Sequence, residues 1–142
     1  MKQFNPPIEV MKTIYILFIR SLLEHCSSLW HKSLSLENIE AIERVQKSAF
    51  KIILQNKYKT YLHALNTLQM ETLVERREHL FKRFTLKNQY NEKLKEYFIK
   101  NDNSYKDKLR QKEKYKVTKY NTERLKNSTI IQMQTLLNEL EG

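Results

Sequence analysis

Glycine and proline are nearly absent from this sequence: its 142 residues include one glycine and two prolines, Pro6 and Pro7. All-β and doubly wound folds need these residue types at their many turns. Hydrophobic residues nevertheless make up 40% of the chain, which is enough for a modest core. We therefore predict an all-α protein, a small helical bundle.

The positions of the helices follow from apolar residues spaced three and four positions apart. Ser35 is a candidate N-cap, and Thr72 with Glu75 has the T-x-x-E spacing of a capping box. The expected helices span approximately residues 8–27, 35–54, 61–70, 72–88, 91–100 and 129–140. The chain is thus predicted to be helical over most of its length.

The helix expected over residues 35–54 has two distinct faces. Its apolar face consists of Ile42, Val45, Ala49, Ile52 and Ile53. Its basic face consists of Arg44, Lys47 and Lys51. A charged helix face is often only solvated surface, but basic residues at this spacing can also hold a phosphate backbone.

Two further helices show similar stripes. In residues 8–27 the helical spacing is carried by Ile14, Leu17, Phe18 and Leu22. In residues 72–88 the expected buried residues are Leu73, Leu80, Phe81 and Phe84. A polar stripe beside them consists of Arg76, His79, Arg83 and Lys87. Arg83 is therefore a candidate contact to nucleic acid.

The composition changes after residue 100. Residues 104–120 contain seven basic and two acidic residues, with Tyr105, Tyr115 and Tyr120 interleaved. Basic side chains can hold phosphates, and tyrosines can stack on unpaired bases. We expect three parts: a helical bundle over residues 1–100, a basic flexible arm over residues 101–128 and an amphipathic helix over residues 129–142. The candidate nucleic-acid contacts of the arm are Lys112, Lys114 and Lys116.

Overall charge points to the same kind of partner. The chain carries 26 Lys and Arg against 16 Asp and Glu, a net charge of +10. This surplus attracts polyanions, because neutralised phosphates release counterions, and it would also attract anionic membrane surfaces. The most apolar run, residues 14–19, is too short to cross a bilayer, and no secretory leader is recognisable. With Cys26 as the single cysteine, we expect a soluble intracellular protein, cytoplasmic or nuclear, without a membrane partner.

Catalytic and metal-binding patterns are weak. The only aspartates are Asp102 and Asp107, and no pair of acids has the context of a two-metal site. His25, Cys26 and His31 lack the second ligand pair that a structural zinc requires. We therefore expect no catalytic residue, no metal, no cofactor and no small-molecule substrate.

Four segments, in order along the chain, resemble one family. Residues 19–31 (IRSLLEHCSSLWH) are similar to an I-R-x-x-L-E-Y…W-H run, although His25 replaces the usual tyrosine. Residues 43–53 (ERVQKSAFKII) resemble an E-R-V-Q-K-R-A-L-K-I-I helix. Residues 71–78 (ETLVERRE) and 121–128 (NTERLKNS) resemble L-E-T-L-x-E-R-R-E and T-E-R-x-K-N-S motifs. This set is similar to the region downstream of the palm in non-LTR (LINE, jockey-like) retrotransposon reverse transcriptases.

The resemblance implies a position within an RNA-directed DNA polymerase. The chain would be the thumb and the region after it, without the fingers and without the palm that carries the catalytic aspartates. Arg44, Lys47 and Lys51 match the basic face of the family helix. Arg76 and Arg77 match its Arg-Arg pair. The implied partners are an RNA–DNA hybrid or duplex, held by its backbone, and the palm of the same polyprotein.

Two alternatives remain open. The chain could be a domesticated helical module that binds protein, with its positive charge serving solubility. It could also be a relic that folds poorly without a palm. An exposed apolar patch around Ile14, Phe18 and Trp30 would favour either alternative. Steeply salt-dependent binding to duplexes would favour the nucleic-acid interpretation.

Overall fold

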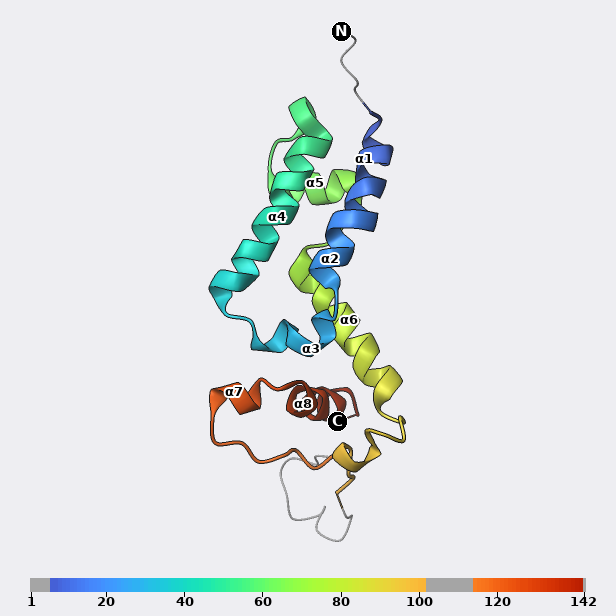
Figure 1. Cartoon of the computed structure of the whole chain (residues 1–142), viewed down its shortest axis with the longest axis vertical. Helices are drawn as coiled ribbons and strands as arrows, with labels where there is room; N and C mark the ends of the chain where they lie inside the picture. Colours follow the sequence, from blue (N-terminus) through green and yellow to red (C-terminus); the bar gives the residue numbers. More distant parts are fainter. Residues whose placement is uncertain (1–5, 102–113, 142) are drawn as a thin grey trace. The chain divides into compact units, whose positions relative to one another are not determined.

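The regular elements of the structure are helices. The computed structural model describes residues 6–101 and 114–141, and these residues form helices and no strand (Figure 1). In this part of the chain, extended backbone pairs only at an isolated antiparallel bridge between Lys100 and Tyr115. The prediction of an all-α protein is confirmed.

The chain divides into two compact units. The first unit comprises Met1–Ser27 and Leu34–Arg77, and the second comprises Ser28–Ser33 and Glu78–Gly142. The boundary lies inside α6 (Leu73–Asn88), whose first turns belong to the first unit. A single continuous helix therefore contributes residues to both units.

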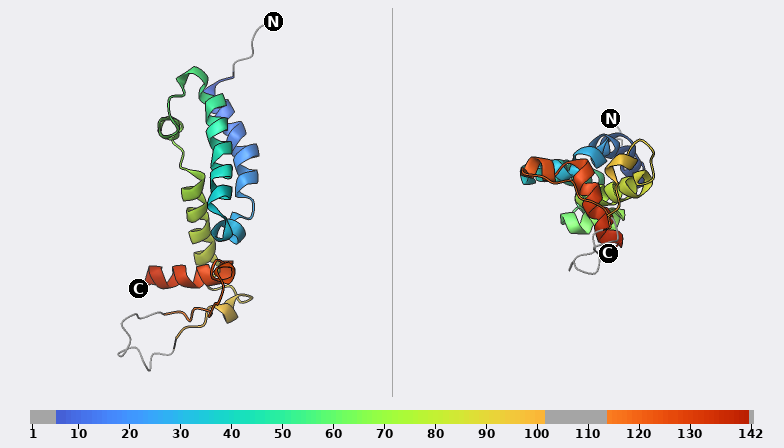
Figure 2. Two further views of the ribbon diagram at one scale, coloured as in Figure 1. Left: turned by 90° about the vertical axis from the view of Figure 1, so that its left-hand side faces the viewer. Right: turned by 90° about the horizontal axis from the view of Figure 1, so that it is seen from below.

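The first unit is built around two long helical stretches. In chain order it contains α1 (Ile8–Ile14), η1 (Tyr15–Arg20), α2 (Ser21–Glu24), α4 (Leu36–Leu54), η3 (Gln55–Lys57), α5 (Tyr61–Leu68) and the first turns of α6. The π-helical η1 joins α1 to α2, and the resulting rod lies beside α4 (Figures 1 and 2). The rod corresponds to the helix expected over residues 8–27.

Side-chain caps set the predicted helix starts. Ser35 Oγ accepts a hydrogen bond from Asn38 N at 3.3 Å, where α4 begins. Thr72 and Glu75 form a reciprocal capping box at the start of α6. Glu75 N donates to Thr72 Oγ1 at 3.2 Å, and Thr72 N donates to Glu75 Oε2 at 3.1 Å. Both predicted caps are confirmed, because each satisfies backbone donors that the first helical turn leaves unpaired.

Among the residues that the structure describes, three non-glycine residues have positive φ where helical segments end. Cys26, Gln55 and Gln69 have φ values of 51°, 46° and 50°. A side chain in the left-handed region costs about 1–2 kcal/mol relative to the right-handed region, so glycine is the usual residue there. The chain accepts this strain at three turns instead of using glycine.

The core of the first unit contains polar as well as apolar residues. Its buried apolar cluster consists of Tyr15, Ala49, Phe50, Ile53, Leu54, Ala64, Leu65 and Leu68. Ala49 and Ile53 were expected there, but Val45 and Ile52 are exposed. The prediction of a buried Val45 and Ile52 is wrong because the inward side of α4 is shared with the polar Glu43 and Gln46.

The second unit combines short helices with extended segments. It contains α3 (Ser27–Trp30) from Ser28 onward, η2 (His31–Ser33), the rest of α6, η4 (Lys95–Tyr97), α7 (Glu123–Lys126) and α8 (Thr129–Glu141). Its buried apolar cluster consists of Phe81, Phe98, Tyr115, Met133 and Leu137. The amphipathic helix expected at the C-terminal end is thus present and packs into this core.

Residues 91–100 do not form the predicted helix. Asn91 Oδ1 accepts a hydrogen bond from Lys93 N at 3.0 Å, and Asn91 O accepts one from Leu94 N at 2.9 Å. These bonds close a turn, and only the short η4 follows. The prediction failed because an asparagine side chain competes with the helical hydrogen-bond pattern for backbone donors.

The described part of the expected arm is anchored to α8. Asn138 Oδ1 accepts from Tyr115 N at 2.8 Å, and Asn138 Nδ2 donates to Tyr115 O at 3.0 Å. Gln134 Oε1 accepts from Thr118 N at 2.9 Å, and Gln134 Nε2 donates to Tyr97 O at 2.6 Å. These two side-chain amides, one helical turn apart, fix one extended segment and the end of η4 to one helix. Residues 102–113 lie outside the described residues.

No helix in the described part of the chain is both long and apolar enough to cross a lipid bilayer.

Candidate nucleic-acid interface

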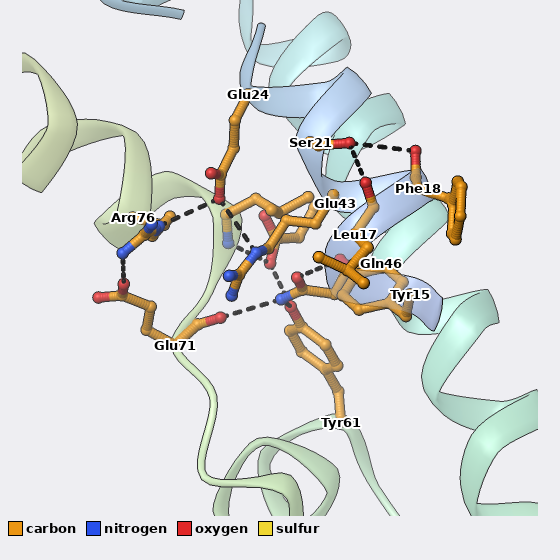
Figure 3. A network of polar contacts seen from close by, with 12 residues as sticks. Tyr15, Leu17, Phe18, Ser21, Glu24, Glu43, Gln46, Tyr61, Glu71 and Arg76 are labelled. Atoms are coloured by element: carbon orange, nitrogen blue, oxygen red, sulfur yellow. Dashed lines mark hydrogen bonds and ion pairs between the residues drawn. The ribbon is translucent and has the colours of Figure 1, made fainter. Parts of the chain in front are cut away.

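Gln46 of α4 connects η1, α5 and the segment before α6 through its side-chain amide (Figure 3). Its Oε1 accepts a hydrogen bond from Tyr15 OH at 2.6 Å. Its Nε2 donates to the Tyr61 hydroxyl oxygen at 2.8 Å and to Glu71 O at 3.0 Å. The side chain is completely buried and its donors are satisfied, so Gln46 serves as a structural tie.

Glu43 extends this network by one helical turn. Its Oε1 accepts hydrogen bonds from Tyr61 OH and from Leu73 N, the latter at 3.2 Å. Burial raises the pKa of the Tyr61 hydroxyl, and the hydrogen bond to Glu43 acts in the same direction. Burial also raises the pKa of Tyr15. Both phenols are therefore protonated donors at neutral pH, and they tie η1 and α5 to α4.

Arg76 belongs to a second polar cluster of the first unit (Figure 3). Its Nε lies 3.1 Å from Glu24 Oε1, and its Nη1 lies 3.5 Å from Glu71 Oε1. Arg20 Nε also approaches Glu24 Oε1, at 3.4 Å. Arg76 is a candidate nucleic-acid contact from sequence, but its guanidinium already joins two acids of its own unit.

Arg77 is buried, with 0% of its surface exposed. It follows Leu73 by four residues and precedes Phe81 by four, so it falls on the inward stripe of α6. A buried guanidinium cannot reach a phosphate backbone. Helical register thus turns this candidate contact toward the interior of the protein.

The basic face of α4 lies on the surface. Arg44 and Lys51 are exposed, and neither has an ion-pair partner among the described residues. Lys47 is half-buried, with its Nζ 5.1 Å from the centre of the Tyr61 ring. Lys51 Nζ lies 5.8 Å from the centre of the Tyr58 ring. The three basic residues share one side of α4, and Arg44 and Lys51 are available to an anionic partner.

The second unit presents a similar basic face on α6. Lys82, Arg83 and Lys87 are all exposed. None of the three has an ion-pair partner in the described part of the chain. Arg83 was predicted from the stripe, whereas Lys82, the residue before it, was not.

The acid of this region, Glu78, is already engaged. Lys32 Nζ lies 2.7 Å from Glu78 Oε1 and 2.8 Å from Oε2, and His31 Nε2 lies 3.0 Å from Oε1. Burial opposes ionisation of Glu78, but the hydrogen bonds from Lys32 and His31 outweigh it and lower the pKa of this carboxyl. The ionised Glu78 therefore neutralises Lys32 and leaves the α6 basic residues uncompensated.

Three predicted contacts fall in or near the expected arm. Lys114 and Lys116 are exposed on the extended segment that carries the buried Tyr115. Lys112 lies outside the described residues. Lys116 is thus held on folded backbone, because its own N donates to Ile99 O at 2.9 Å.

Positive charge is distributed unequally between the two units. The first unit has 10 Lys and Arg and 7 Asp and Glu, a net charge of +3. The second unit has 16 Lys and Arg and 9 Asp and Glu, a net charge of +7. The electrostatic attraction for a polyanion is therefore greatest at the second unit.

An apolar face runs along the rod formed by α1, η1 and α2. It consists of Val10, Ile14, Leu17, Phe18, Ile19 and Leu22, all exposed. Leu17, Phe18 and Leu22 have 61%, 66% and 76% of their surfaces exposed. Contiguous exposed apolar residues of this kind usually mark an interaction site. Tyr15 of the same rod is buried, and its hydroxyl donates a hydrogen bond to Gln46 Oε1.

The residues considered as metal ligands are not brought together. His25 and Cys26 are exposed at the end of α2, whereas His31 is buried and bonded to Glu78. Among residues 6–101 and 114–141, no group of three or more His, Cys, Asp or Glu could hold a metal ion.

Sequence reasoning missed the buried polar residues. Glu43, Gln46, Arg77 and Gln134 all lie in the interior. Helical register contained the signal: Gln46 precedes Phe50 by four residues, and Arg77 lies midway between Leu73 and Phe81. Polar residues flanked by apolar neighbours at spacing four are the positions to examine for buried hydrogen bonds.

Comparison of the chain with protein-family models, curated proteins and solved structures found no match. The resemblance therefore rests on the four sequence segments alone. Each segment contributes to the fold: Glu24 pairs with Arg76, Gln46 ties α4 to η1, α5 and Glu71, Glu75 caps α6, and Thr122 Oγ1 accepts from Leu125 N at 3.2 Å to cap α7.

Proposed function

We propose that this chain is a non-catalytic, thumb-like fragment that contacts the backbone of a nucleic-acid duplex electrostatically. The duplex would be the RNA–DNA template–primer hybrid of a retrotransposon polymerase. The palm that performs the chemistry would lie elsewhere in the parent polyprotein.

The observation that carries this proposal is the uncompensated basic side of α4. Arg44 and Lys51 are exposed and have no ion-pair partner among the described residues, whereas Arg76 of the same unit is held by Glu24 and Glu71. Ion-paired arginines gain little from a phosphate because they must first give up their partner. Basic side chains without an ion-pair partner bind phosphates and release counterions from the duplex, which increases the affinity.

The exposed apolar face is compatible with the same proposal. A thumb packs against a palm in the family that the sequence resembles, and Leu17, Phe18 and Leu22 offer a surface for such a contact. The two surfaces then have separate tasks: the apolar face joins the polymerase, and the basic side of α4 follows the duplex.

The test is binding of the whole chain to a labelled RNA–DNA hybrid by fluorescence anisotropy over a salt series. The double variant Arg44→Gln/Lys51→Gln should bind more weakly. The slope of log K against log salt should become shallower by about 0.9 for each phosphate contact removed. The control Lys93→Gln/Lys95→Gln removes the same charge from exposed positions of the second unit.

An equal loss in the two double variants would mean that binding responds only to total charge, and the role of α4 would be rejected. Absence of salt-dependent binding in the unmodified chain would reject the nucleic-acid function altogether.

The second candidate function is a protein interaction module without a nucleic-acid role, and the exposed apolar face favours it. Replacing Leu17 and Phe18 by serine should then abolish association of the chain with its protein partner, measured by light scattering. Binding to the RNA–DNA hybrid would be absent even in the unmodified chain. Under the first proposal the same substitution leaves hybrid binding intact, because these residues lie on the rod and not on the basic side of α4.

A further inference from the structure

The second unit contains a groove that the proposed duplex contact does not use. Its volume is about 510 Å³, and it is lined by Glu96, Tyr97, Ile99 and Asn101, by residues 116–119 and by Gln134 of α8. Small-ligand sites in proteins have volumes of roughly 300–1,000 Å³, so the groove can admit a group of nucleotide size.

The walls of this groove are fixed by backbone and amide hydrogen bonds. Lys116 N donates to Ile99 O at 2.9 Å, which joins the two extended segments. Gln134 bonds to Tyr97 O and to Thr118 N, and therefore holds both walls at once. Such a preformed site loses little conformational entropy when a ligand binds.

Exposed and buried side chains alternate from Tyr97 to Ile99 and from Lys114 to Lys116. Phe98 and Tyr115 are buried in the core of the second unit. Their neighbours Tyr97, Ile99 and Lys116 are exposed and line the groove. One wall of the groove thus contains the aromatic Tyr97 and the aliphatic Ile99, and the other wall contains the cationic Lys116.

The charges around the groove favour an anionic ligand. Lys116 and Lys119 are both exposed lining residues without an ion-pair partner in the described part of the chain. Glu96 is the acid of the lining, and its carboxylate can accept a hydrogen bond from the exocyclic amine of a base. Lysines beside an accessible tyrosine form the combination with which proteins bind single-stranded nucleic acid: the cations hold the backbone and the ring stacks on a base.

We propose that this groove binds an unpaired nucleotide of a single-stranded nucleic acid, with Tyr97 stacked on the base and Lys116 and Lys119 holding the adjoining phosphates. The site is distinct from the basic side of α4, although the identity of the ligand rests on the proposed nucleic-acid function. Paired bases do not expose their faces, so a duplex cannot use Tyr97 in this way.

The experiment compares a labelled single-stranded oligonucleotide with an RNA–DNA hybrid, using the whole chain and fluorescence anisotropy. Tyr97→Leu keeps an apolar side chain but removes the stacking ring. It should weaken single-strand binding by about tenfold and leave hybrid binding unchanged. Lys116→Gln/Lys119→Gln should weaken single-strand binding and flatten its salt dependence.

The matched control is Tyr90→Leu, because Tyr90 is a tyrosine of the same unit with 76% of its surface exposed and does not line the groove. Equal binding of the single strand by Tyr97→Leu and the unmodified chain would overturn the proposal, as would equal losses in Tyr97→Leu and Tyr90→Leu. Loss of hybrid binding on Arg44→Gln/Lys51→Gln is a separate readout, so failure at the groove and failure at α4 are distinguishable.

Discussion

The two units of the molecule use polar side chains in different ways. In the first unit, Gln46 and Glu43 join helix to helix inside the core, and Arg76 joins two acids at its edge. In the second unit, Gln134 and Asn138 join a helix to extended backbone. The side-chain bonds of the first unit hold helices against one another. Those of the second unit hold segments whose backbones form few hydrogen bonds of their own.

The difference also concerns charge. The described ion pairs of the first unit join residues within that unit, whereas Arg44 and Lys51 on α4 have no ion-pair partner among the described residues. The second unit carries a net charge of +7, and its basic residues on α6 and beside the groove have few acidic neighbours. A motif rich in arginine and glutamate therefore does not by itself identify a binding surface, because some of its charged side chains form ion pairs within the fold.

The largest expected effect comes from removing the amide of Gln46. Gln46→Leu leaves the hydroxyl of Tyr15 and the carbonyl of Glu71 without their partner in the interior. We expect a loss of about 3 kcal/mol in the free energy of unfolding, measured by urea denaturation. The control Ser48→Ala changes an exposed position of the same helix and should have almost no effect.

Hydrogen exchange sharpens the comparison between the units. In Gln46→Leu, amides of the first unit should exchange faster while those of the second unit change little. Equal acceleration in both units would show that they unfold as one cooperative body and that the division is only geometric.

A smaller effect is expected from Gln134→Leu in the second unit. The buried amide bonds to two backbone groups that lie near the surface, where water can replace part of the interaction. We expect a loss of about 2 kcal/mol, and faster exchange at Thr118 N in particular. Gln132→Leu, which removes one hydrogen bond to Lys126 O from a half-buried position, should cost less. The reverse order would contradict the assigned role of Gln134.

The smallest effect is expected from Glu78→Gln, and it depends on pH. The pKa of Glu78 is lowered from 4.5 in the folded chain, so its contribution to stability is complete well above pH 4.5 and is lost as pH falls through the folded pKa. Because Glu78 is largely accessible, we expect at most about 1 kcal/mol at neutral pH. Thermal unfolding at several pH values should show the two proteins converging in acid, and a constant difference would contradict the ion pair.

Sequence alone predicts the helical class, the capped helix starts and the position of the basic residues on α4. These features depend on local chemistry: Ser35 and Thr72 cap because their hydroxyls reach nearby backbone donors, and Arg44 and Lys51 share a side because of helical periodicity. Such features can be predicted without knowing which residues are in contact in the folded structure.

The rest depends on contacts between distant residues. The side that α4 buries is decided by Tyr15, Tyr61 and Glu71, which lie 31, 15 and 25 residues from Gln46 along the chain. The groove is harder still to predict from sequence, because it depends on hydrogen bonds from Gln134 to Tyr97 and Thr118, which are far from it in sequence.

The central claim is that basic residues of the resembling segments have divided roles, with Arg76 holding the fold and Arg44 contacting nucleic acid. The most direct measurement compares Arg76→Gln with Arg44→Gln, recording both the free energy of unfolding and the affinity for an RNA–DNA hybrid at fixed salt. We expect Arg76→Gln to lower stability by about 1 kcal/mol with little change in the affinity of the folded chain, and Arg44→Gln to lower the affinity with little change in stability. Equal effects of the two variants on affinity, with stability unchanged in both, would contradict it.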